Sequence, residues 1–155
     1  MASSLAEILV VTGHQHQTIR AVLAPYPVRI VHNPHFSTSI KAGVMATLPC
    51  AGYLFFLGDM PLISNLSSKQ LCQVFICCKD PAKPIIVPTW EGKKGNPVIF
   101  SQIYHNDLLA LSGNQGARSL LQQYVTKTVM APLPDPGGHI DIDTPQRYQK
   151  VQKNI

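Results

Sequence analysis

Charged residues are scarce in this chain of 155 residues: Asp, Glu, Lys and Arg together make up 14%, and only 8 are acidic. A typical domain has about 25% charged residues. Because 45% of the residues are hydrophobic, the chain is too apolar to be disordered, and we expect one domain over residues 1–155. The net charge of +5 suggests an affinity for anions, but Lys and Arg are scattered, so no nucleic-acid partner is expected.

Long apolar runs and the signatures of several enzyme classes are also missing. No stretch reaches the roughly 18 apolar residues of a membrane span, so no membrane partner is expected. No G-x-S-x-G, Cys/His nucleophile signature or Walker loop occurs. The 4 cysteines form no C-x-x-C pair, which argues against a zinc knuckle; we expect reduced thiols in a cytoplasmic protein.

Short apolar runs alternate with helical patterns from end to end. Strands are predicted at residues 8–11, 28–31, 53–57, 85–87, 98–100 and 127–131. Helices are predicted at 14–24, 39–48, 67–79 and 117–124, and a last one begins with Thr144 as N-cap and Pro145 after it. Ser67-x-x-Gln70 has the form of a capping box, so Ser67 is the expected N-cap of its helix. This alternation indicates a three-layer α/β fold.

Asp59 follows the strongest predicted strand, in the run Leu57-Gly58-Asp59. Ligands of open α/β sheets bind outside the carboxyl ends of the strands. An Asp at that edge can hold a hard cation such as Mg²⁺, together with phosphate oxygens. An ordinary turn also explains an Asp after a Gly, and spacing alone favours the turn slightly.

A second acidic group lies near the carboxyl end of the chain. Asp135, Asp141 and Asp143 are three of the 8 acidic residues, which favours a functional role over a solvated face. Asp141 and Asp143 lie two residues apart on a segment that leads into the last predicted helix, and we expect only one of them to reach a given site.

Two further segments could meet an anion. Residues 91–97 combine two glycines with Lys93 and Lys94, although an ordinary hairpin is the better expectation from the pattern alone. Residues 113–118 open a predicted helix, with Arg118 close to its start. The histidines are spread out, and His14-x-His16 has no acidic residue nearby, so no zinc site is expected.

Seven segments stand in an order that is informative as a set. They are Val10-Val11-Thr12-Gly13-His14, Val31-His32-Asn33-Pro34, Ser39-Ile40-Lys41-Ala42-Gly43, Leu57-Gly58-Asp59-Met60-Pro61-Leu62, Gly92-x-x-Gly95-Asn96-Pro97-Val98-x-Phe100, Gly116-Ala117-Arg118 and Asp141-Ile142-Asp143-Thr144-Pro145. In this order they resemble the MobA-like nucleotidyltransferases, and within them the molybdenum cofactor cytidylyltransferases. The resemblance runs from about residue 8 to residue 148.

The resemblance implies a Rossmann-like nucleotidyltransferase fold and a reaction. CMP or GMP would pass from CTP or GTP to molybdopterin with release of pyrophosphate, with Mg²⁺ as cofactor. Asp59 and Asp143 are the implied catalytic residues, and Asp59, Asp141 and Asp143 the implied metal ligands. The resemblance further implies that the substrates are bound by Gly58, Gly95, Asn96, Pro97 and Arg118. Of these, Gly95, Asn96 and Pro97 belong to the loop on the pterin side.

The chain departs from the family in three places. Members usually begin with a strand and a loop, L-A-A-G-x-S-x-R-M-G-x-x-K, that holds the triphosphate; no G-x-S-x-R occurs here, and the first glycine is Gly13. The Gly-Met-Ser-Ser loop expected after Asn33-Pro34 is also missing, and Asn114 stands where the family tends to have Asp. We therefore expect a domain truncated at its amino end that binds CTP or GTP weakly.

Alternatives follow from these departures. The chain could be a degenerate, non-catalytic member that binds molybdopterin or a partner protein. A related transferase acting on a sugar or alcohol phosphate is a third interpretation, against which Gly95-Asn96-Pro97 argues mildly. The apolar strands at 8–11 and 53–57 would each have an open edge, so we expect either that they pair directly or that the chain forms a homodimer.

Overall fold

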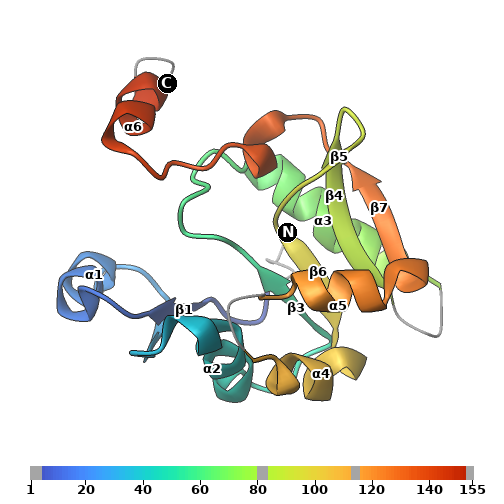
Figure 1. Ribbon diagram of the computed structural model, residues 1–155, viewed down its shortest axis with the longest axis horizontal. Helices are drawn as coiled ribbons and strands as arrows, with labels where there is room; N and C mark the ends of the chain where they lie inside the picture. Colours follow the sequence, from blue (N-terminus) through green and yellow to red (C-terminus); the bar gives the residue numbers. More distant parts are fainter. Residues whose placement is uncertain (1–4, 80–83, 113–115, 153–155) are drawn as a thin grey trace. The chain divides into compact units, whose positions relative to one another are not determined.

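The computed structural model describes residues 5–79, 84–112 and 116–152 (Figure 1). Helices and strands alternate along the chain, as the sequence predicts for an α/β fold. The chain divides into two compact units: the first unit comprises Met1–Tyr53 and Ser101–Thr126, the second Leu54–Phe100 and Lys127–Ile155. The single domain expected from the length remains a prediction. Among the described helices, none combines the length and apolar content needed to cross a membrane.

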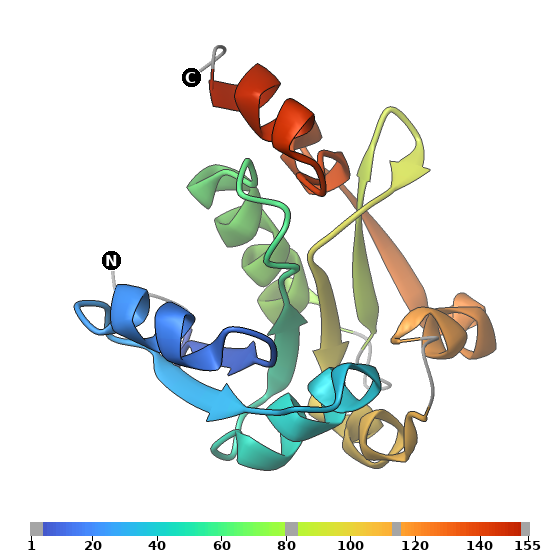
Figure 2. The ribbon, with the colours of Figure 1, turned by 60° about the vertical axis from the view of Figure 1, so that its left-hand side comes forward.

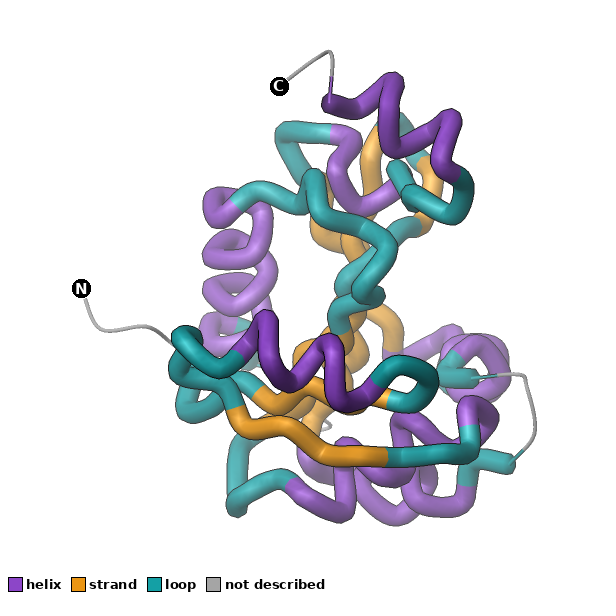
Figure 3. Tube along the Cα trace, turned by 90° about the vertical axis from the view of Figure 1, so that its left-hand side faces the viewer, coloured by secondary structure: helices purple, strands orange, loops and turns teal. Residues whose placement is uncertain are grey.

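The first unit begins with a strand–helix–strand arrangement. Strand β1 (Leu9–Thr12) pairs in parallel with β2 (Arg29–His32), and α1 (His16–Leu23) connects them (Figure 3). Parallel neighbours need such a crossover because their ends lie at opposite edges of the sheet. Helix α2 (Ser39–Ala46) packs on β1 at Gly43, where an added Cβ would lie 3.2 Å from Val11 Cγ2.

The described part of the first unit also holds two short helices, α4 (His105–Ala110), after the 3₁₀ turn η2 (Gln102–Tyr104), and α5 (Arg118–Gln123). Helix α4 packs against α2. Helix α4 was not expected from the sequence. Its apolar pattern covers only six residues, fewer than the window in which helical periodicity can be recognised.

Five strands form the larger sheet, in the order β3 (Gly52–Phe55), β6 (Val98–Ser101), β4 (Ile85–Trp90) and β5 (Lys93–Lys94), with β7 (Thr128–Pro132) on β4. Strand β4 is parallel to β7 but antiparallel to β5 and β6, so the sheet is mixed. The tight connection from β4 to β5 sets that direction. Glu91 and Gly92 both have positive φ, 49° and 76°, as a two-residue type I′ hairpin turn requires.

Helix α3 (Asn65–Cys77) covers one face of this sheet (Figure 2). Leu71 of α3 is fully buried with Ile86 of β4 and Ile99 of β6, and partly buried side chains of the helix extend the cluster. Burying such side chains stabilises a fold by about 1.5–3 kcal/mol each. This layer holds fixed the strand ends from which the functional loops emerge.

The amino end of α3 differs from the sequence prediction. The N-cap is Ser64, whose Oγ accepts a hydrogen bond from Ser67 N at 3.0 Å, so the expectation of Ser67 was wrong. Ser67 and Gln70 form no capping box, since Ser67 N donates to Ser64 Oγ; Gln70 Nε2 donates to Pro132 O at 2.8 Å. Ser67 is fully buried instead, and its hydroxyl donates to Asp135 at 2.5 Å.

Within the residues that the structure describes, the apolar strands β1 and β3 do not pair directly, which was the first of the two expectations for their edges. Strand β1 lies in a two-stranded sheet with β2, while β3 lies in the five-stranded sheet, so the described strands do not include a direct β1–β3 pair. Strand β3 also stops at Phe55, two residues earlier than predicted, and Phe56 and Leu57 are exposed by 47% and 46%. The homodimer remains a prediction.

Asp135 joins α3 to the segment that follows β7. Its carboxylate accepts hydrogen bonds from Ser64 Oγ at 2.7 Å, from Ser67 Oγ and from Gly137 N at 2.9 Å. Burial raises the pKa of Asp135, while the hydrogen bonds from Ser67, Ser64 and Gly137 lower it. The hydrogen bonds together outweigh burial, so the pKa lies below its ordinary value. Three donors thus favour the ionised carboxylate in the folded protein.

The Asp135→Asn variant tests this anchor. At pH 7 we expect unfolding free energy to fall by about 1–3 kcal/mol, because hydrogen bonds to a charged acceptor are lost or weakened. A lowered folded-state pKa stabilises the protein above the unfolded pKa of about 3.9, and this contribution disappears as the pH falls through the folded value. Urea unfolding from pH 7 downward should therefore show the two proteins converging. A difference that stays constant to pH 3 would contradict the account.

Candidate functional site

Asp59 lies in the loop between β3 and α3, and its side chain is exposed. The backbone N–H of Ile142 donates to Asp59 O at 2.7 Å. Ile142 stands between Asp141 and Asp143, so the second predicted acidic segment runs directly beside the first. The structure brings together residues that are far apart in the sequence, at the edge where the loop leaves β3.

The three carboxylates have different surroundings. Asp141 Oδ1 forms an ion pair with Arg147 of α6 (Pro145–Gln152) at 3.1 Å. Asp143 is exposed and directly precedes Thr144, whose Oγ1 accepts from Arg147 N at 3.2 Å and so caps α6 as predicted. In the described parts of the chain, the Asp59 and Asp143 carboxylates have no ion pair. These two are the acidic groups best able to accept a cation.

The donor set fits a hard divalent cation held only partly by protein. Carboxylate oxygens are the ligands that Mg²⁺ and Mn²⁺ prefer. Within the described ranges, however, no three His, Cys, Asp or Glu side chains converge as a complete metal cage. Mg²⁺ is commonly held by one or two carboxylates, waters and substrate phosphates, so the predicted roles of Asp59 and Asp143 do not require a complete cage.

The Gly95–Asn96–Pro97 loop is bound to the same carboxyl-terminal segment. Gly95 N donates to Pro88 O at 2.9 Å, and Asn96 N donates to Gly138 O at 3.0 Å. The Asn96–Pro97 peptide bond is cis, and Pro97 is fully buried. The predicted loop residues therefore belong to the framework that carries residues 141–143.

Glycines permit this close packing. A Cβ on Gly138 would collide with Asn96 O, and a Cβ on Gly137 would collide with Leu62 O. On Gly95 it would lie 2.5 Å from His139 Cε1. The loop after β3, the 95–97 loop and the turn η5 (Pro136–His139) consequently pack backbone against backbone. By contrast, Gly58 has open space around it, so its predicted role receives no steric explanation.

His139 is a residue that sequence reasoning missed. Its Nε2 lies 3.0 Å from Lys93 O and donates to it, which fastens the lysine-bearing hairpin to η5. Its Nδ1 is buried and has no hydrogen-bond partner among the described residues. The ring also lies 6.1 Å from that of Trp90. The only sequence signal was its place directly after Gly137-Gly138.

The remaining predicted residues lie in the first unit or outside the described residues. Arg118 belongs to the first unit, where it is exposed at the start of α5. Its role with an anion remains a prediction. Asn114 lies outside the described residues, as do the neighbouring residues 113 and 115. The second unit alone thus supplies Asp59, Asp143 and the 95–97 loop.

Solved structures share this fold. Rv0371c from Mycobacterium tuberculosis H37Rv is 20% identical, with a TM-score of 0.80 over 97% of this chain and 77% of that one. Its manganese complex has a TM-score of 0.79, with 20% identity over 98% of this chain and 80% of the other. A nucleotidyl transferase from Methanothermobacter thermautotroptrophicus, Mth528, has a TM-score of 0.78 and 18% identity over 97% and 74% of the two chains.

The sequence itself identifies the family. No curated protein matches the chain. The model of the MobA-like NTP transferase domain does match it, over residues 1–129, which includes β1, the Asp59 loop and the 95–97 loop. Since that match covers most of the chain, this protein belongs to the family of MobA-like NTP transferase domains.

Proposed function

We propose that this chain is a nucleotidyltransferase of molybdenum cofactor biosynthesis, which transfers CMP or GMP from the nucleoside triphosphate to molybdopterin. The observation that carries the proposal is the hydrogen bond between Ile142 N and Asp59 O, because it places Asp143 and Asp59 on adjacent segments. Membership of the MobA-like family supports the reaction class. The resemblance to molybdenum cofactor cytidylyltransferases supports the acceptor.

The reaction needs positioning and neutralisation of charge. A terminal phosphate oxygen of molybdopterin attacks the α-phosphorus of CTP or GTP and forms a new P–O bond. The bond from the α-phosphorus to the bridging oxygen breaks, and pyrophosphate leaves with that oxygen. No covalent enzyme nucleophile is required, which agrees with the lack of nucleophile signatures.

Asp59 and Asp143 would hold a divalent metal against the phosphates. Bound there, Mg²⁺ supplies positive charge that offsets the charge developing on the phosphate oxygens. The manganese complex of Rv0371c supports a divalent cation in this fold. Exposure of Asp59 leaves its carboxylate accessible to a metal that arrives with the nucleotide.

The hairpin and the 95–97 loop are the proposed acceptor side. Lys93 and Lys94 are exposed and carry positive charge that suits a phosphate group. His139 ties Lys93 to η5, and Asn96 is bonded to Gly138 of the same turn. One rigid framework would therefore orient both the acceptor and the metal.

Manganese titration followed by electron paramagnetic resonance tests the metal site. We expect Asp59→Asn and Asp143→Asn each to weaken Mn²⁺ binding by about tenfold or more, since a charged ligand becomes neutral. Asp107→Asn is the matched control, because Asp107 lies on α4 and accepts only from Tyr124 in the contacts described. Equal Mn²⁺ affinity in Asp59→Asn and Asp107→Asn would refute the proposed metal site.

Asp141→Asn separates the two neighbouring carboxylates. Since Asp141 already pairs with Arg147 in an exposed position, we expect Mn²⁺ affinity to change by less than about threefold. The same titration measures it. A loss as large as that of Asp143→Asn would reassign the metal ligand to Asp141.

Pyrophosphate release decides between catalysis and binding alone. With molybdopterin, Mg²⁺ and either CTP or GTP, the proposal predicts release of pyrophosphate that depends on Asp59. The alternative is a non-catalytic family member that binds molybdopterin without turnover, and the same experiment distinguishes the two. Molybdopterin binding by calorimetry without any pyrophosphate release would establish that alternative and contradict the enzyme.

A further inference from the structure

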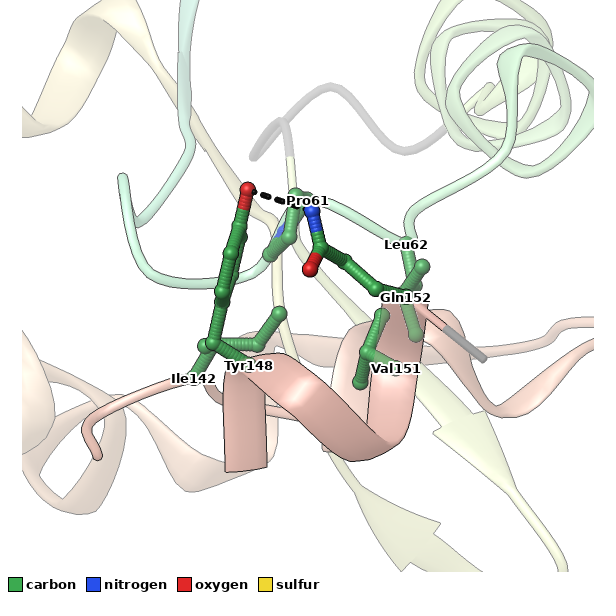
Figure 4. Close-up of a pocket in the computed structure, with 6 residues that line it drawn as sticks. All are labelled: Pro61, Leu62, Ile142, Tyr148, Val151 and Gln152. Carbon is green, nitrogen blue, oxygen red and sulfur yellow. Dashed lines mark hydrogen bonds between the residues drawn. The ribbon is translucent and has the colours of Figure 1, made fainter. Parts of the chain in front are cut away.

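A pocket of about 660 Å³ lies beside the candidate metal site, within the second unit. Its lining residues are Pro61, Leu62, Ile142, Tyr148, Val151 and Gln152. Figure 4 shows the side chains of Tyr148 and Gln152 rising from α6 toward the segment that carries Pro61 and Leu62. The volume falls within the range of about 300–1,000 Å³ typical of small-molecule sites.

The pocket and the carboxylates share the same two segments. Pro61 and Leu62 follow Asp59 in the loop after β3. Ile142 contributes to the wall of the pocket, while its backbone N–H holds Asp59 O at 2.7 Å. A ligand seated in the pocket would therefore have one end next to the segments that carry Asp59 and Asp143.

The lining chemistry suits a flat, uncharged ring. Pro61, Leu62, Ile142 and Val151 supply apolar surface, and Tyr148 supplies an aromatic ring that is 53% exposed. None of the lining side chains carries a charge at neutral pH. Aromatic rings pack against one another in offset or edge-on arrangements, which adds about 0.5–1.5 kcal/mol beyond burial of area.

One polar group can read the edge of such a ring. Gln152 Nε2 donates to the Tyr148 hydroxyl oxygen at 3.0 Å, which fixes the amide at the mouth of the pocket (Figure 4). A primary amide has a second N–H and an acceptor oxygen, so one side chain can both donate to and accept from a heterocycle. An ordinary hydrocarbon ring offers no such match.

We propose that this pocket binds the planar heteroaromatic ring of the acceptor substrate, with the ring against Tyr148 and its polar edge on Gln152. This assignment rests on the proposed function, because the acceptor substrate is the one that takes part in the proposed transfer. It places the ring on the α6 side of Asp59, while the phosphate of the same molecule extends toward Asp59 and Asp143. Leu62 O packs on Gly137 and Asn96 O on Gly138, so the pocket and the 95–97 loop meet at one turn.

Free pterin, followed by its own fluorescence anisotropy, is the probe. Val151→Trp fills the pocket, and Gln149→Trp places the same side chain at an exposed position of α6 that does not line it. We expect Val151→Trp to weaken pterin binding by about tenfold or more, and Gln149→Trp by less than about twofold. Circular dichroism checks that both variants keep the fold.

A second variant does not depend on filling space. Gln152→Leu removes the amide but keeps a side chain of similar size. It should weaken the binding of pterin while leaving the binding of naphthalene, a ring without polar edge atoms, within about twofold. Equal effects on both probes would overturn the role of Gln152. Equal pterin affinity in Val151→Trp and Gln149→Trp, or no pterin binding by the unaltered protein, would overturn the pocket.

The proposal and the proposed function can fail separately. Mn²⁺ binding that depends on Asp59, with pterin binding insensitive to Val151→Trp, keeps the metal site and overturns the pocket assignment. Pterin binding that is lost in Val151→Trp, with no pyrophosphate release from CTP or GTP, supports the pocket as a ring-binding site and overturns the transfer reaction.

Discussion

The hydrogen bond from Ile142 N–H to the carbonyl of Asp59 is the contact on which the candidate site depends. It joins the loop after β3 to a segment that lies beyond the last strand. Without it, Asp59 would be a turn residue at the end of a strand and Asp143 would precede a surface helix. With it, two exposed carboxylates and the wall of a pocket share one edge.

A set of close backbone contacts supports that bond. Gly137 and Gly138 lie directly against Leu62 O and Asn96 O, where no side chain could fit. Asp135 anchors the start of the same turn through the hydroxyls of Ser64 and Ser67. The result is a frame made of main chain and short polar side chains. Such a frame can hold exposed, charged groups in place without burying them.

Much of the fold was predictable because its signals are local. The strand at Leu9–Thr12, the helix at Ser39–Ala46 and the cap at Thr144 all follow from patterns within a few residues. The order of motifs also identified the family and singled out Asp59 and the 95–97 loop. The N-cap of α3 was misplaced because Ser64 and Ser67 both stand at the start of the helical pattern, and either serine could cap the helix. In the structure Ser67 N donates to Ser64 Oγ, and both hydroxyls donate to the distant Asp135, a contact that no local pattern shows.

Other parts of the site could not be predicted, since they depend on contacts between distant segments. His139 contributes by donating a hydrogen bond to Lys93 O. The pocket forms only because α6 lies near Pro61 and Leu62. The sequence around Asp141 and Asp143 does not show which of the two carboxylates pairs with an arginine. The ion pair with Arg147 makes that distinction in three dimensions.

The bond between positions 59 and 142 also has a consequence for the order in which the protein forms. Contacts between residues far apart in the sequence close long loops and form slowly, whereas β1, α1 and β2 pair within the first 32 residues. Chains emerge from the ribosome with the amino end first. The strand–helix–strand arrangement can therefore assemble while synthesis continues, but the carboxylate edge has to wait for residue 142. In a nascent chain the β1–β2 pair can therefore form before the candidate site does.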